Sequence, residues 1–131
     1  MVRKVLIIDD DNINNFLCER IIKLANFSEE VNTFINSDSA MEFLKLNADN
    51  PSDLPEIIFL DINMPIKTGW DFLNEFDVIK NDFKKEMKIF MLSSSVYEED
   101  VKKARSYATV TDYITKPLSV ETLKKLEIQI K

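Results

Sequence analysis

Three short apolar runs, each ended by acidic or hydroxyl side chains, constrain most strongly what this chain can fold into. The runs cover residues 5–8, 57–60 and 89–92, and each has four apolar residues in a row. Runs this short and continuous are typical of strands buried on both faces of a sheet. Weaker strand candidates cover residues 31–35 and 112–114. The sequence therefore predicts five strands.

Amphipathic segments alternate with these strands. Apolar residues recur at helical spacing in the first of them, at Ile13, Phe16, Leu17, Ile21 and Leu24. A second helix is predicted to begin at residues 37–39, and further helices at 70–76 (extending towards 79), 96–106 and 120–130. Alternation of strands and helices predicts an α/β fold, in which helices cover both faces of a parallel sheet. The length of 131 residues suits one domain.

Polar residues predict how three of the helices begin. Asp11 is expected to cap the first helix, and Ser119 the last. Ser95 and Glu98 have the spacing of a capping box at the start of the fourth helix.

Counts of three residue types exclude several classes of chemistry. The one glycine, Gly69, cannot form a dinucleotide-binding fingerprint or a Walker loop. The absence of histidine removes Ser-His and Cys-His catalytic pairs and histidine metal ligands. The one cysteine, Cys18, permits no internal disulfide; we expect an inert, packed thiol in a reducing cytoplasm. Carboxylates, hydroxyls and amines are left to carry any chemistry.

Charge and hydropathy restrict the partners. The net charge of −6 argues against direct nucleic-acid binding, and the lysine clusters are diluted by nearby acids. The apolar run at residues 5–8 is too short for a signal peptide or a membrane span. We therefore expect a cytoplasmic protein that contacts neither a membrane nor nucleic acid.

Asp9, Asp10 and Asp61 directly follow the first and third apolar runs. Sites in parallel α/β folds form beyond the carboxyl ends of the strands, near the point where the strand order reverses. If these two strands are neighbours, the three carboxylates converge, and their repulsion raises at least one carboxyl pKa. Mg²⁺ suits such a site. Helix capping is the alternative, but it does not account for the matching acid after the third run.

Ser93 ends the fourth strand, and Lys116 follows the fifth. A hydroxyl and an ammonium beside a carboxylate-metal cluster can hold a transferring phosphoryl group. Taken singly, a serine cap and an exposed lysine before a proline turn explain them as well. The arrangement of all these groups on successive strand ends is what indicates phosphoryl chemistry.

The chain resembles the receiver domain of bacterial two-component response regulators, the family that includes the single-domain chemotaxis regulator. The resemblance spans residues 1–131 and is carried by V-L-I-I-D-D at 5–10, I-I-F-L-D-I-N-M-P at 57–65 with Gly69, M-L-S at 91–93 and Y-I-T-K-P at 113–117. It implies a flavodoxin-like, doubly wound parallel sheet of five strands in the order 2-1-3-4-5, with five helices.

The resemblance also implies a role for each matching residue. Asp61 would be the phosphoacceptor, attacking a phospho-histidine donor. Mg²⁺, with Mn²⁺ as a substitute, would be held by Asp9, Asp10, Asp61 and the backbone carbonyl of Asn63. Ser93 and Lys116 would contact phosphoryl oxygens.

Further implications concern the switch. Tyr113 matches the switch aromatic of the family, although a half-buried strand tyrosine is an equally good interpretation. The Lys116–Pro117 bond is expected to be cis. A departure from the family lies at residues 107–112, Y-A-T-V-T-D, where relatives commonly carry a small Gly-Ala pair before the fifth strand.

The implied partners are a sensor histidine kinase or phosphotransfer protein and an unidentified downstream protein target. Signals would leave through the face of the fourth helix, fifth strand and fifth helix, which includes Lys102, Arg105, Asp112 and Lys124. Such a domain is not an enzyme in the ordinary sense, because it catalyses only its own phosphorylation and dephosphorylation. Whether the chain stands alone or is part of a longer protein stays open, as do its oligomeric state and phosphoryl lifetime.

Two other functions compete with this one. A small haloacid-dehalogenase-like phosphatase would need D-x-D-x-T after the first strand, but Ile13 stands at the threonine position. A degenerate receiver acting as a constitutive binding module would not need the intact set of Asp9, Asp10, Asp61, Ser93 and Lys116.

Overall fold

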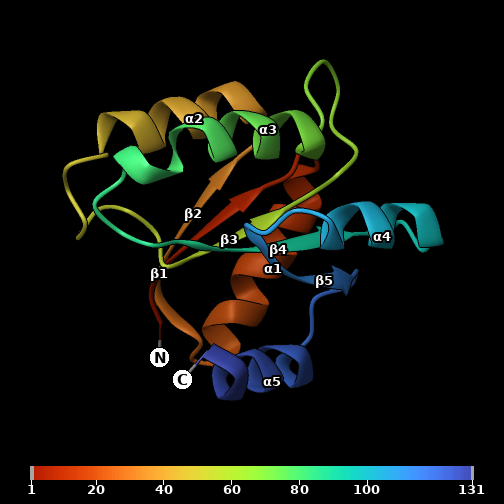
Figure 1. The fold of residues 1–131 in the computed structure, drawn as a ribbon. Helices are drawn as coiled ribbons and strands as arrows, with labels where there is room; N and C mark the ends of the chain where they lie inside the picture. Colours follow the sequence, from red (N-terminus) through yellow and green to blue (C-terminus); the bar gives the residue numbers. More distant parts are fainter. Residues whose placement is uncertain (1, 131) are drawn as a thin grey trace.

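The computed structural model describes residues 2–130 and contains one parallel sheet of five strands. The strands are β1 (Val2–Ile8), β2 (Ser28–Phe34), β3 (Ile57–Leu60), β4 (Lys88–Ser93) and β5 (Val110–Thr115). Their order is β2-β1-β3-β4-β5, so the predicted order is confirmed (Figure 1). No helix among residues 2–130 is long and apolar enough to cross a membrane.

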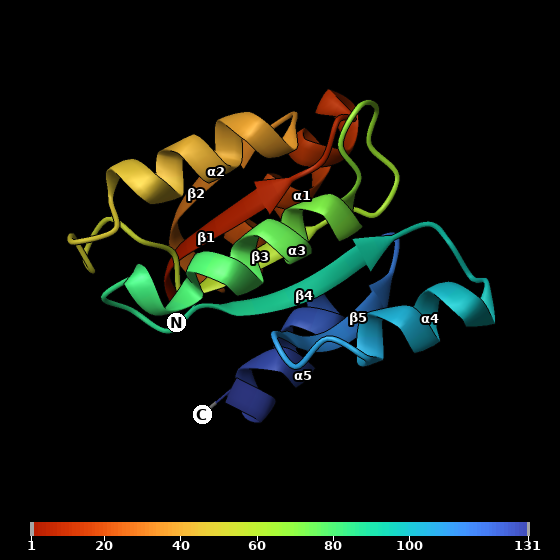
Figure 2. The same ribbon diagram turned by 45° about the horizontal axis from the view of Figure 1, so that its top comes forward.

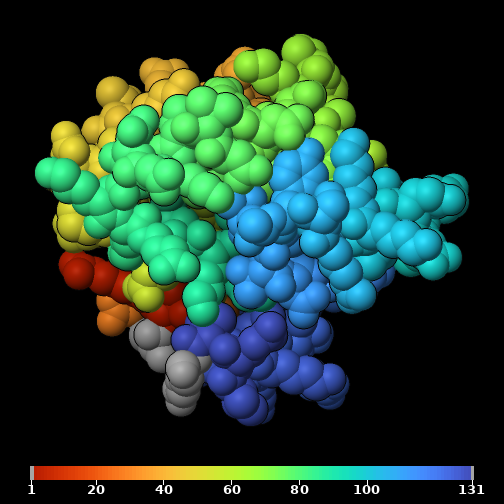
Figure 3. Space-filling model, in the orientation of Figure 1, coloured from red at the N-terminus to blue at the C-terminus, as the bar shows by residue number. Residues whose placement is uncertain are grey.

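Helices cover both faces of the sheet, as predicted. The helices are α1 (Asn12–Leu24), α2 (Ser37–Leu46), α3 (Gly69–Ile79), α4 (Glu98–Arg105) and α5 (Val120–Ile130), and a short 3₁₀ turn (Lys80–Asp82) follows α3. Both ribbon views show α2 and α3 together on one side of the sheet and α5 on the other (Figures 1 and 2). In the space-filling view, the segment around α4 projects at the right edge of the molecule (Figure 3).

Alternate residues of the central strands supply two cores. Leu6 and Ile8 of β1 point to the core under α2, α3 and α4, whereas Val5 and Ile7 point to the core under α1 and α5. Because both faces are covered, the side chains at all four positions are buried. The central strands therefore hold their carboxyl ends in fixed positions.

The apolar positions that predicted α1 do not form its buried face. Four of them are 54–73% exposed, namely Ile13, Phe16, Leu17 and Leu24. The buried residues of the helix are Asn15, Cys18 and Ile22. The apolar periodicity correctly predicts a helix. The face of α1 that packs on the sheet is a different one, however, formed by Asn15, Cys18 and Ile22. Spacing alone does not tell which stripe is covered.

The edge strands are longer than predicted. β2 begins at Ser28 rather than at residue 31, and β5 runs from Val110 to Thr115 rather than over 112–114. Edge strands are held by backbone pairing to one neighbour, so their polar ends leave no apolar run in the sequence. In β5, Thr111 is an extra residue, because Ile89 pairs with Val110 and the next pair already joins Phe90 to Asp112.

The predicted start of the fourth helix was wrong in one detail. The helix begins at Glu98, so Ser95 lies too far back to cap it. The Ser95 hydroxyl instead donates to the carboxylate of Asp100, and Glu98 pairs with Lys102 at 3.3 Å. The other two predicted caps are confirmed: Asp11 accepts from the first turn of α1, and the Ser119 hydroxyl accepts from Thr122 N–H.

Candidate functional site

The three predicted carboxylates lie together at the carboxyl ends of β1 and β3. Ile8 and Leu60 are paired in the sheet, so the residues that follow them, Asp9 and Asp61, lie side by side. Carboxylate oxygens of Asp9, Asp10 and Asp61 all lie within 4.8 Å of one another. Asp9 is 2% exposed and Asp61 6%, while Asp10 faces solvent. The cluster is therefore open on the side of Asp10.

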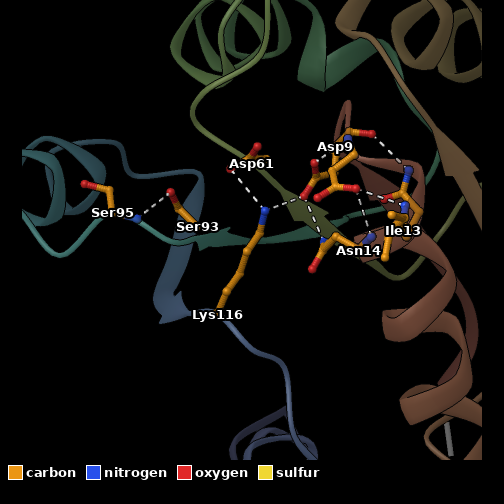
Figure 4. A network of polar contacts seen from close by, with 9 residues as sticks. Asp9, Ile13, Asn14, Asp61, Ser93, Ser95 and Lys116 are labelled. Carbon is orange, nitrogen blue, oxygen red and sulfur yellow. Dashed lines mark hydrogen bonds and ion pairs between the residues drawn. The ribbon is translucent and has the colours of Figure 1, made fainter.

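Lys116 lies between the two buried acids. Its Nζ donates to Asp9 Oδ2 at 2.6 Å and lies 3.7 Å from Asp61 Oδ1 (Figure 4). Burial alone would lower the pKa of Lys116, but the hydrogen bond to Asp9 and the charges of Asp61 and Asp9 outweigh it, so the pKa is raised. The ammonium is thus charged and shared unequally between the two acids.

Asp61 has a raised pKa of about 6. Burial is the main cause and the charge of Asp9 the second; Lys116 opposes both, and Asp10 adds a smaller rise. The direction agrees with the prediction that one carboxyl pKa is raised, but the repulsion between carboxylates that the prediction invoked is a smaller cause than burial.

The donor set fits a hard divalent cation. Three carboxylates with one ammonium leave net negative charge at the cluster, and Mg²⁺ and Mn²⁺ prefer such oxygen ligands. The backbone carbonyl of Asn63 accepts no hydrogen bond within residues 2–130, so it too is available as a ligand. The residues present thus fit the metal expected from the sequence.

Asp9 is also held by residues that the sequence analysis missed. Asn14 Nδ2 donates to Asp9 Oδ2 at 2.9 Å, and Asn15 Nδ2 donates to the Asp9 carbonyl at 2.9 Å. Asp11 N–H donates to Asp9 Oδ1 at 2.9 Å. Two adjacent asparagines in the first turn of a helix are the only signal that the sequence offers, and it does not show which strand end they contact.

Ser93 and Tyr113 meet at the loop between β4 and α4. Ser93 is fully buried, and its Oγ accepts from Ser95 N–H at 3.2 Å (Figure 4). The Tyr113 hydroxyl donates to the Ser95 carbonyl at 2.8 Å. Within the described residues no hydrogen bond joins Ser93 to the acids. The structure thus places both residues at the site's edge and ties both to the same loop residue.

The loop after β3 is shaped by Gly69. Gly69 N–H donates to the Ile62 carbonyl at 2.8 Å, which brings the start of α3 against the end of β3. A Cβ at this position would lie 2.3 Å from the backbone oxygen of Asp61. Within this loop Ile66 has a positive φ of 69°. The Lys116–Pro117 peptide bond is cis, as expected.

Cys18 takes no part in the chemistry. Its side chain is buried under the sheet, and burial, followed by the charge of Asp9, raises the pKa of the thiol to about 11. The thiol therefore stays protonated at neutral pH, and the prediction of inert packing is confirmed.

Fold and site together define a doubly wound α/β domain with an acidic cation site at the carboxyl edge of its sheet. The response regulator receiver domain family matches residues 5–127, and the chain belongs to this family. It is a phosphoacceptor signalling domain of two-component systems and not a conventional enzyme, so the phosphatase alternative is excluded.

Three relatives illustrate the likeness. The probable methanogenesis regulatory protein FilR2 of Methanothrix harundinacea is 25% identical over 97% of this chain and 80% of its own length. A crystal structure of a two-component response regulator from Cytophaga hutchinsonii is 32% identical, with a TM-score of 0.89, and 98% of this chain and 96% of that chain are covered. The Mn²⁺-bound form of the response regulator Rcp1 is 25% identical, with a TM-score of 0.72 and coverage of 98% and 91%. Rcp1 is a protein of Synechocystis.

Proposed function

We propose that this chain accepts a phosphoryl group on Asp61 from a phospho-histidine donor, in a reaction that requires Mg²⁺. The observation that carries the proposal is the position of Asp61. Its buried carboxylate belongs to the three-acid cluster and lies 3.7 Å from the Lys116 ammonium. Membership of the receiver family supports the same chemistry.

In the transfer, a carboxylate oxygen of Asp61 forms a bond to phosphorus while the bond from phosphorus to the histidine nitrogen breaks. The nitrogen keeps the electron pair of that bond. The transferring group carries negative charge on its equatorial oxygens, so catalysis depends on alignment and on neutralisation of that charge. Lys116 neutralises one oxygen by moving from Asp9 to the phosphoryl group, and the Ser93 hydroxyl donates to another.

Asp9, Asp10, Asp61 and the carbonyl of Asn63 would hold the metal. When bound, the ion supplies further neutralisation of the phosphoryl oxygens. Mg²⁺ suits this set, since it keeps several waters and takes few carboxylates. The Mn²⁺-bound form of Rcp1 supports a divalent cation here, with Mn²⁺ as the substitute.

The donor is a sensor histidine kinase or a phosphotransfer protein. The exposed apolar side chains of Ile13, Phe16 and Leu17 support a protein donor. They belong to the first turns of α1, directly after the acids of β1, and exposed apolar patches mark contact surfaces. A donor bound there presents its phospho-histidine to the acid cluster.

The output is a change at the face of α4, β5 and α5. When the Ser93 hydroxyl turns to the phosphoryl group, it gives up the N–H of Ser95. Tyr113 holds the carbonyl of the same residue, so a shift of Ser95 also acts on the Tyr113 contact and on the loop that leads into α4. The face that includes Lys102, Arg105, Asp112 and Lys124 thereby shifts between two conformations. One of these conformations binds an unidentified target protein.

Phosphorylation by acetyl phosphate tests the assignment. With Mg²⁺ present, intact-mass spectrometry is expected to show one added phosphoryl group, which disappears in Asp61→Asn and in EDTA. Asp82→Asn, which changes an exposed acid in the 3₁₀ turn, is expected to label like the wild type. Labelling that persists in Asp61→Asn would contradict the choice of acceptor. A wild type that takes no label would favour a constitutive binding module.

A further inference from the structure

Two consecutive asparagines of α1 hold Asp9 from two sides. Asn14 donates its amide to Asp9 Oδ2 at 2.9 Å, and Asn15 donates to the Asp9 carbonyl at 2.9 Å. The position of the helix itself is fixed by Asp11, whose Oδ1 accepts from Ile13 N–H at 2.9 Å and from Asn14 N–H at 3.3 Å. The Asn14 amide is thus presented to Asp9 by a capped helix end.

The carboxylate of Asp9 accepts three hydrogen bonds, and one of them is lost in the proposed reaction. They come from Asp11 N–H, from the Asn14 amide and from the Lys116 ammonium. The shortest of the three, at 2.6 Å, is the bond from Lys116. The proposed reaction requires Lys116 to leave Asp9 for a phosphoryl oxygen. Among residues 2–130, Asn14 is then the one side chain that still donates to this carboxylate.

We propose that Asn14 is a positioning residue, which keeps the Asp9 carboxylate directed at the cation when Lys116 leaves it. The inference rests on the proposed function, because it assumes that Asp9 takes part in holding the cation. In this role Asn14 would contact neither the cation nor the phosphoryl group. It acts only through Asp9.

A neutral amide suits this role better than a charged donor. The Lys116 ammonium cancels the charge of Asp9 and thus competes with the cation. The Asn14 amide fixes the direction of the carboxylate and leaves its charge available. Outer partners that orient a ligating carboxylate commonly change metal affinity 10–100-fold when they are removed.

Titration with Mg²⁺ by isothermal calorimetry tests the proposal in the purified chain and in a Lys116→Met background, which reproduces the state in which the ammonium has left Asp9. The Asn14 and Asn12 variants are compared within that background. Asn14→Leu removes the amide while keeping the branched shape and the number of side-chain heavy atoms, and Asn14→Gln retains an amide on a longer side chain. Asn12→Leu is the matched control, because Asn12 lies in the same first turn, is exposed and makes no side-chain hydrogen bond within residues 2–130. Circular dichroism in EDTA checks that each variant folds, and Asn14→Ala replaces Asn14→Leu if the latter does not.

We expect the Kd for Mg²⁺ to rise about tenfold or more in Asn14→Leu, less in Asn14→Gln and not at all in Asn12→Leu. An unchanged Kd in Asn14→Leu would overturn the inference while leaving the proposed function intact. An equal rise in Asn14→Leu and Asn12→Leu would also overturn it, since the effect would then belong to the helix end. If the wild type itself binds no Mg²⁺, the failure lies in the proposed function.

Discussion

Burial and the charge of Asp9 disfavour the ionised form of Asp61. Its pKa of about 6 in the folded chain compares with 3.8 for a free side chain. The folded state therefore binds this proton more tightly than the unfolded state does. The resulting stabilisation is present below the unfolded pKa and is lost as the pH rises through about 6.

Asp61→Asn mimics the protonated carboxyl at every pH. In EDTA at pH 7.5 we expect it to be more stable than the wild type, by at most about 3 kcal/mol, which is the pKa difference of about two units converted to free energy. The gain is expected to vanish near pH 3, below the unfolded pKa of 3.8, where Asp61 is neutral in both the folded and the unfolded chain. Urea unfolding at both pH values measures this, and a gain independent of pH would contradict it.

Gly69 is the residue at which the backbone of the site allows no side chain. Its ideal Cβ would lie 2.3 Å from the Asp61 carbonyl oxygen and 3.0 Å from Ile62 Cα, both backbone atoms that cannot rotate away. Gly69→Ala must therefore move the start of α3 or the end of β3. We expect a loss of about 2–3 kcal/mol in the free energy of unfolding, together with weaker Mg²⁺ binding. Ala104→Gly, a core change on another helix, is expected to lower stability without weakening Mg²⁺ binding.

Between elements, an aromatic contact joins α3 to the end of α4. The rings of Trp70 and Tyr107 stack with centroids 6.0 Å apart and an interplanar angle of 10°. Lys103 Nζ lies 4.8 Å from the Trp70 ring centroid, and the Tyr107 hydroxyl donates to Asn74 Oδ1 at 2.9 Å. Tyr107 begins the segment in which the family resemblance leads one to expect small residues, and here its ring packs against the tryptophan.

We expect Tyr107→Ala to lower the free energy of unfolding by about 1–2 kcal/mol, through loss of the stack and of the hydrogen bond. Tyr107→Phe should keep the stack and lose less. Tyr97→Ala is the control, because that side chain is 70% exposed at the start of α4. Urea unfolding followed by the fluorescence of Trp70 measures all three. A cost for Tyr97→Ala equal to that for Tyr107→Ala would show that the contact is not responsible.

The elements differ in how far the sequence could predict them. β3 matches its apolar run residue for residue, because a strand buried on both faces must be apolar throughout. The start of β2 at Ser28, Glu29 and Glu30 was missed because these polar residues form no apolar run. They are held by backbone pairing with β1 and by an ion pair of Glu30 with Lys4, which spacing in the sequence does not show. In α1 the spacing marks a helix, but the choice between its two stripes depends on how the whole helix packs.

At the scale of the whole molecule, the strand order brings the acids of two separate sequence motifs together into one site. The acids are 51 or 52 positions apart in the sequence, and only the adjacency of β1 and β3 brings Asp61 to Asp9 and Asp10. Their convergence could be predicted, since the ends of neighbouring parallel strands meet at one edge. The contact of Asn14 with Asp9 could not, because it depends on the rotation of α1 about its axis.

The same convergence couples cation binding to global stability. In the unfolded chain Asp61 is separated from Asp9 and Asp10, so a cation that needs all three binds only the folded state. At ten times its Kd, free Mg²⁺ then stabilises the chain by about 1.4 kcal/mol, which raises Tm by about 5 °C for a domain of this size. Protons compete for Asp61, whose pKa is about 6, so the rise should shrink at pH 5.

Asp10→Asn provides a sharp control for this coupling. Asp10 is exposed, so its substitution removes one ligand without disturbing a buried contact. We expect the variant to fold normally in EDTA and to lose most of the Mg²⁺-dependent rise in Tm at pH 7.5, as measured by scanning calorimetry. Sodium chloride at matched ionic strength separates specific binding from screening of the net charge of −6. If sodium chloride raised Tm as much, or if Asp10→Asn kept the full rise, the stabilisation would come from general screening and not from a cation held at the ends of β1 and β3.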